Sequence, residues 1–326
     1  MKDTPQSRMA SEDLPIMRPP SPSREDQLLV DEAALESFPA SDPPAWTPTH
    51  AGTPAQPTIK AETPRELRSK LRVDVEHLVA GGRQAGAEYI ASTFLDTGRH
   101  VVRIPIADAG AGEDIETVIR GGAAEGGEEL VIGARYDSNP SAVAVLLGLA
   151  RLLSGRRFAR TVRLAAFAND RAGSLAYARR LREQRTALRG VISLDSVGFF
   201  VDRHARSSFA SRLFRPWRGT FVAFVGDRHS RALVDEVRLA FSLGTRLDAR
   251  SFAVPNVLPI VSTSDQRTFS QEGFRAVLVT DTGPLRNPHP PSAEELPSKL
   301  SYDDMADVVF GLAAVAARLA GGGASG

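Results

Sequence analysis

Apolar segments of strand length alternate with segments of helical periodicity between residues 130 and 194. Strands are expected at 130–134, 161–167 and 190–194, and helices at 141–153 and 174–185. Parallel strands need a long crossover connection, usually a helix, and such helices cover both faces of the sheet. The alternation therefore predicts an α/β fold: a three-layer αβα sandwich with a mostly parallel, mixed sheet.

Further elements are expected on both sides of this region. The segment Thr63-Pro64-Arg65-Glu66 is a capping box with proline at the first helical position, so a helix should begin there. Additional helices are expected at 86–97, 231–241 and 302–319, and additional strands at 101–106, 116–120, 220–225 and 275–279.

Residues 1–62 differ from the rest of the chain because they are rich in Pro, Ser, Thr, Asp and Glu. The stretch SFPASDPPAWTP at 37–48 consists largely of residues that break helices and sheet ladders. Its few apolar side chains cannot offset the entropy lost on ordering. We therefore expect a disordered tail at 1–62, one α/β domain at 63–320 and a flexible Gly-rich end at 321–326.

Composition excludes several functions. The 326 residues contain no cysteine, which rules out disulfides, thiol catalysis and cysteine-ligated zinc. The 40 Lys and Arg nearly cancel the 39 Asp and Glu, so neither nucleic acid nor an anionic membrane is expected as a partner. The first residues lack the apolar core of a secretory signal, and no apolar run reaches the ~20 residues that span a bilayer. We therefore expect a cytoplasmic protein.

Charged residues gather where the predicted strands end. Arg135 and Asp137 follow the first strand, Asp170 and Arg171 follow the second, and Asp195 follows the third. Ligand sites in open α/β sheets form at the carboxyl ends of the strands. These five residues are therefore the candidates for a functional site.

Six segments in this order resemble metallopeptidase family 28 from about residue 66 to 319. They are LVIGARYDS (130–138), SAVAVLLGLARLL (141–153), VRLAAFAND (162–170), VISLDSVG (191–198), SDQ (264–266) and DTGPLRNPH (281–289). This family contains zinc aminopeptidases, glutaminyl cyclases and the transferrin receptor ectodomain. The resemblance implies a zinc-peptidase-like domain, in which two zinc ions are held by five side chains and a glutamate acts as general base.

The chain departs from the family pattern at most of these positions. Arg135 stands at a histidine ligand, and Asp137 matches the second half of that His-x-Asp segment. The loop carrying the bridging aspartate is missing, which leaves Ser138 at that position. Asp170 stands at the general base and Arg171 at the glutamate ligand beside it. Guanidinium has no lone pair to give a metal.

Of the two remaining ligand positions, one matches the family pattern and the other does not. Asp195 matches a metal-binding aspartate, whereas Pro291 stands at the last histidine ligand and His289 lies two residues earlier. Asp265 and Gln266 match a Ser-Asp-His segment, with Gln266 in place of the histidine. His289, Asp265 and Gln266 are candidate cleft residues, and we expect Asp265 to be a helix N-cap.

Losing three or four of five ligands, two of them to cations, argues against a two-zinc site. We therefore expect no cofactor, and we hypothesise that Arg135 and Arg171 replace the zinc charge by pairing with Asp137, Asp170 or Asp195. An alternative is that the two arginines bind an anionic ligand such as a carboxylate.

The predicted function follows from this loss. We expect a catalytically inactive homologue that acts as a binding or scaffolding module for a peptide, small-molecule or protein ligand. The alternative is a residual zinc-dependent peptidase or amidohydrolase that removes N-terminal residues at a rearranged site. A third and weaker hypothesis is metal-independent chemistry by Asp170 and a neighbouring arginine.

Overall fold

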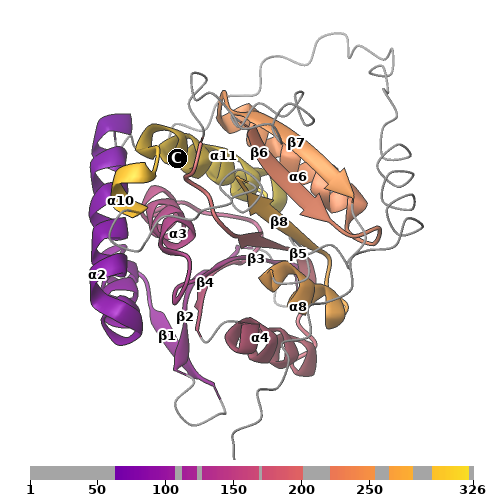
Figure 1. The fold of residues 1–326 in the computed structure, drawn as a ribbon. Helices are drawn as coiled ribbons and strands as arrows, with labels where there is room; N and C mark the ends of the chain where they lie inside the picture. The colour runs from indigo at the N-terminus through magenta and orange to yellow at the C-terminus, as the bar shows by residue number, and fades with distance from the viewer. Residues whose placement is uncertain are drawn as a thin grey trace, which may run out of the picture. The chain divides into compact units, whose positions relative to one another are not determined.

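The computed structural model describes residues 63–106, 112–122, 127–168, 171–200, 221–253, 264–281 and 296–322. Figure 1 shows these residues as one sheet with helices packed on it. The expected tail at 1–62 lies outside the described residues, as do residues 323–326 of the expected flexible end. Among the described helices, none combines the length and the apolar composition that a membrane span requires.

The sheet has eight strands in the order β1-β2-β4-β3-β5-β8-β6-β7. Parallel pairing joins β3 to β4, β3 to β5, β5 to β8 and β6 to β7, and antiparallel pairing joins the other three neighbours. The strands are β1 (Val101–Pro105), β2 (Glu113–Ile119), β3 (Glu129–Arg135), β4 (Val162–Phe167), β5 (Leu188–Leu194), β6 (Phe221–Gly226), β7 (Asp248–Ala253) and β8 (Ala276–Thr280).

Helices cover both faces of this sheet. One layer contains α2 (Pro64–Asp96), α3 (Pro140–Leu152), α6 (Arg231–Gly244) and α11 (Tyr302–Ala320), and the other contains α4 (Arg171–Glu183) and α8 (Asp265–Gln271). The short α10 (Leu296–Lys299) contacts α2. Along β3, Leu130 and Ile132 belong to the core on the first side, whereas Val131 belongs to the core on the second. The predicted αβα sandwich with a mixed, mostly parallel sheet is therefore confirmed.

The amino-terminal element α2 contains the two predicted helices, separated by a kink. Thr63 and Glu66 form the expected capping box, and α2 then runs on to Asp96. Only Gly82 leaves helical geometry, at φ 62° and ψ −171°, where it breaks the helix into two halves. Glycine adopts this left-handed φ at little steric cost, so the break falls at the residue that tolerates it.

Candidate functional site

Strand register brings the candidate residues to one edge of the sheet. Arg135 at the end of β3 pairs with Phe167 at the end of β4, and Leu194 at the end of β5 pairs with Ala134. The backbone N–H of Asp195 donates to Val279 on β8, which extends the same edge. The residues that follow β3, β4, β5 and β8 therefore share one region, as predicted for the carboxyl ends of parallel strands.

An ion pair between Arg135 and Asp265 lies at this edge. Arg135 Nη2 is 3.1 Å from Asp265 Oδ1, and the two side chains are 13% and 3% exposed. Ser174 Oγ donates to the same carboxylate oxygen over 2.8 Å. Burial, and secondly the charge of Asp195, raise the pKa of Asp265 to about 6 against the lowering effect of Arg135 and Ser174.

This pair corrects one detail of the sequence analysis and adds another. Asp265 is not the N-cap of α8: Ser264 holds that position, and Asp265 is the first helical residue, paired with Arg135. Asp265 is a partner of Arg135 that the sequence analysis did not consider. The hypothesis that Arg135 or Arg171 pairs with Asp137, Asp170 or Asp195 stays a prediction.

Asp195 is bound by side chains that follow β3 and β5. Asn139 Nδ2 donates to Asp195 Oδ1, and Ser196 Oγ lies 3.1 Å from the same oxygen. Asn139 Oδ1 accepts the backbone N–H of Ser196 at 3.1 Å, which fixes both ends of the amide. Ser196 takes a left-handed φ of 52°. An amide donor thus occupies one oxygen of Asp195, the residue that the resemblance matches to a metal-binding aspartate.

Asn139 was not among the predicted site residues. It immediately precedes α3 and stands at the helix N-cap, yet its side chain caps no N–H of that helix. The available signal was the missing loop, because the deletion leads the chain straight from Ser138 through Asn139 into the helix. A polar residue in such a shortened connection must lie near the strand ends.

The other predicted site residues differ in exposure. Asp137 is half-buried, and Ser138 and Arg171 are exposed. Gln266 is fully buried; it donates to Ser270 Oγ at 3.0 Å and to the carbonyl of residue 276 at 3.4 Å, away from Arg135. Asp170, His289 and Pro291 lie outside the described residues.

Asp114 on β2 is a second buried acid that the sequence analysis missed. Its Oδ1 accepts the backbone N–H of Ala168 at 2.9 Å, and its Oδ2 has no hydrogen-bond partner among the described residues. Burial raises the pKa of Asp114 to about 7, and the charges of Asp265 and Glu116 act in the same direction. A methyl group on Gly173 would clash with Asp114 Oδ1, so α4 packs directly on this carboxyl group.

The described side chains at this edge do not fit the two zinc ions that the resemblance implies. A zinc site needs imidazole, thiolate or carboxylate donors that converge on one point. Within the described ranges, no three His, Cys, Asp or Glu side chains come together in that way. Arg135 Nη2 instead donates to Asp265, and Asn139 Nδ2 donates to Asp195.

Comparisons with known proteins agree with this fold. No protein-family model matches the chain. The uncharacterized protein YfbL of Escherichia coli (strain K12) is 28% identical over 256 residues, which is 69% of this chain and 77% of YfbL. The crystal structure of the LapA aminopeptidase of Legionella pneumophila matches with a TM-score of 0.62 at 15% identity, covering 86% of this chain and 80% of LapA.

A glutaminyl cyclase from Fimbriiglobus ruber matches with a TM-score of 0.56 at 17% identity, covering 81% of this chain and 98% of the cyclase. The chain therefore has the fold of aminopeptidases and glutaminyl cyclases. The resemblance stated from the sequence is confirmed at the level of the fold.

Proposed function

We propose that the chain is a catalytically inactive homologue of zinc aminopeptidases and acts as a binding or scaffolding module. The observation that carries this proposal is the buried pair between Arg135, at the position of a histidine ligand, and Asp265. A protonated guanidinium cannot coordinate zinc, and its charge repels a dication. The position therefore contributes positive charge where a metal site needs a lone pair.

The hydrogen bonding of Asp195 supports the same proposal. A carboxylate oxygen that accepts from Asn139 and Ser196 has less capacity to bind a metal. For zinc to bind there, Asn139 Nδ2 would have to move away and Arg135 would have to leave Asp265 unpaired. Breaking a buried ion pair costs about 3–5 kcal/mol. Zinc binding to so few donor side chains does not offset this cost.

Metal content and peptidase activity of the purified full-length chain test this proposal. We expect well under one zinc per chain by mass spectrometry, and no release from leucine p-nitroanilide with or without added Zn²⁺ or Co²⁺. An active zinc aminopeptidase serves as the positive control for the substrate. One or more zinc ions per chain, together with hydrolysis that a chelator abolishes, would show a residual aminopeptidase and overturn the proposal.

A direct variant sharpens this test. Arg135→His restores an imidazole at the first ligand position and removes the charge that repels a dication. We expect it to remain without hydrolytic activity, because Arg171 and the hydrogen-bonded Asp195 are unchanged. Activity in Arg135→His alone would mean that the rest of the site is intact, which contradicts the proposed inactivity.

A further inference from the structure

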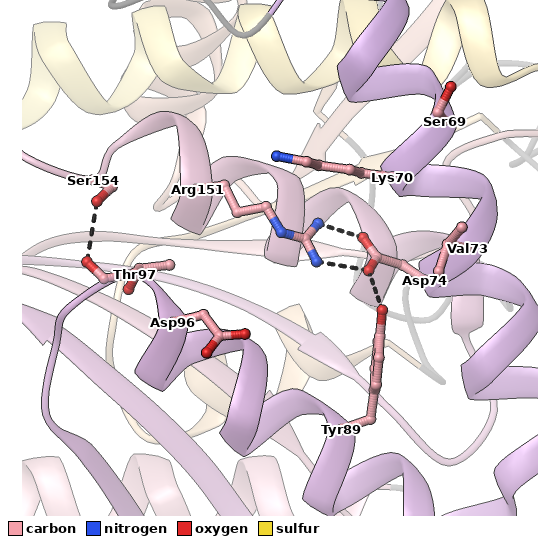
Figure 2. A pocket seen from close by; sticks show the side chains of 9 residues that line it. All are labelled: Ser69, Lys70, Val73, Asp74, Tyr89, Asp96, Thr97, Arg151 and Ser154. Carbon is pink, nitrogen blue, oxygen red and sulfur yellow. Dashed lines mark hydrogen bonds and ion pairs between the residues drawn. The ribbon is translucent and has the colours of Figure 1, made fainter.

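A separate cleft of about 550 Å³ opens between the two halves of α2 and the carboxyl end of α3 (Figure 2). Arg151, near the end of α3, borders it. Asn139 of the strand-end site precedes the same helix, and the step of 12 positions from it to Arg151 corresponds to ~18 Å along the helix axis. The cleft is therefore distinct from the strand-end site. Its volume falls within the range of small-molecule sites.

The floor of the cleft is a buried, hydrogen-bonded ion pair. Asp74 is fully buried, and Arg151 donates to its two oxygens over 2.6 and 2.7 Å. The hydroxyl of Tyr89, from the second half of α2, donates to Asp74 Oδ1 at 2.7 Å. Burial, and then Asp74, raise the pKa of Tyr89 to about 12, so this hydroxyl stays a donor. His77 stacks on the Tyr89 ring with centroids 4.7 Å apart.

These contacts give the cleft a fixed base. Bidentate pairing holds the guanidinium plane of Arg151 in one orientation, and three hydrogen bonds offset the cost of burying Asp74. The Tyr89 contact also ties the two halves of α2 together across the break at Gly82. A ligand in the cleft would thus meet a preorganised surface, which reduces the entropy lost on binding.

The walls above this base carry opposite charges. Figure 2 shows the ammonium group of Lys70 on one side of the Arg151 guanidinium and the carboxylate of Asp96 on the other. Val73 lines the same cleft and is 44% exposed, so it offers an apolar contact. The cleft therefore has a cationic side, an anionic side and an apolar wall.

We propose that this cleft binds a zwitterionic ligand: an apolar amino acid or a short apolar peptide with free ends. Its carboxylate would lie beside Lys70 and Arg151, its ammonium group beside Asp96, and its apolar side chain against Val73. A simple anion would be repelled by Asp96, and a simple cation by Lys70. The inference concerns a different site from the proposed function, so it stands or fails independently of metal binding at the strand ends.

Calorimetric titration of the full-length chain with leucyl-leucine tests the proposal. Two controls remove one charge each: N-acetyl-leucyl-leucine lacks the ammonium group, and leucyl-leucine amide lacks the carboxylate. We expect the free dipeptide to bind roughly threefold to fivefold more tightly than either control, as one solvent-exposed ion pair allows. Raising the salt concentration should reduce this preference.

Exposed residues permit clean variants. Lys70→Gln should abolish the preference for the free dipeptide over its amide, and Asp96→Asn should abolish the preference over the acetylated form. Lys299→Gln, an exposed lysine on α10 outside the cleft, is the matched control and should change neither preference. Thermal unfolding of each variant checks that the fold is retained.

Three outcomes would overturn the proposal. One is no binding of the free dipeptide at millimolar concentration, and another is equal affinity for all three peptides. The third is binding that Arg171→Gln weakens while Lys70→Gln and Asp96→Asn leave it unchanged, because the ligand would then occupy the strand-end site. Zinc content plays no part in these measurements, so failure here is distinguishable from failure of the proposed inactivity.

Discussion

Replacing Asp114 by asparagine should stabilise the protein most at alkaline pH and have little effect below about pH 4. The carboxyl group is buried between β2 and α4, and only Oδ1 has a described hydrogen-bond partner. Asp265 and Glu116 raise its pKa, whereas Arg180 lowers it without cancelling the effect of burial. Asparagine has nearly the same shape as the protonated acid and never carries the charge.

The sign follows from the raised pKa of about 7, compared with 3.8 for an ordinary aspartate. Below pH 3.8 the folded and unfolded chains both hold the proton, so Asp114 contributes no penalty. As the pH rises towards 7, the unfolded chain ionises first and the free energy of unfolding falls. Above pH 7 the penalty is complete, at roughly 3 pKa units of about 1.36 kcal/mol each, or about 4 kcal/mol.

Chemical denaturation at pH 5 and pH 8 measures this effect. Ionisation of Asp114 lowers the free energy of unfolding by about 1.6 kcal/mol at pH 5 and by about 4 kcal/mol at pH 8, and Asp114→Asn removes this loss. The free energy of unfolding of the variant, relative to the unchanged chain, should therefore rise by roughly 2–3 kcal/mol between the two pH values. Asp235→Asn, at an exposed position on α6, is the matched control and should stay within about 0.5 kcal/mol at both values. An advantage that does not change between pH 5 and pH 8 would refute the reasoning.

Three further predictions concern residues in and around the strand-end site. In each, chemical denaturation measures the change in the free energy of unfolding. Arg135→Met should lower the free energy of unfolding by about 3 kcal/mol at pH 8, because it leaves Asp265 unpaired. The loss should be smaller below pH 6, where Asp265 is protonated, and small when Asp265 is already replaced by asparagine. Additive losses from the two substitutions would contradict the pairing. Gly173→Ala should cost about 1–3 kcal/mol, because the methyl group would meet a carbonyl oxygen at 2.5 Å; unchanged stability would be inconsistent with this packing. Asn139→Ala should cost about 1 kcal/mol without raising zinc content; bound zinc in this variant would show that the amide had been blocking Asp195.

The sequence predicted the central strands well because their signal is local. The expected strands at 130–134, 161–167 and 190–194 correspond to β3, β4 and β5, whose apolar runs are buried on both faces. The expected strand at 116–120 was too short, since β2 begins at Glu113 and has acids at Glu113, Asp114 and Glu116. Acidic residues are seldom fully buried, yet Asp114 and Glu116 both are.

Distant partners explain what the sequence could not predict. Glu116 is buried because Arg163 from β4 and Tyr177 and Arg180 from α4 donate to it. Asp265, a partner of Arg135, is 130 positions away in the chain. No local pattern contains such pairings, whereas the order of charged residues at strand ends predicted which residues share this edge of the sheet.

The charges at the strand ends also explain why the site can remain folded without zinc, as proposed. A two-zinc site balances several carboxylates with two dications. Here two of the described acids are balanced differently: Asp265 by the guanidinium of Arg135, and Asp195 by hydrogen bonds from Asn139 and Ser196. Asp114 has only one backbone donor, and the raised pKa follows because proton uptake is the remaining way to remove its charge. A cation and an amide thus neutralise or occupy acids at the strand ends, a proton neutralises Asp114 on β2, and only the proton is removed by raising the pH. Alkaline pH should therefore loosen the contact between β2 and α4 before it affects the Arg135 pair.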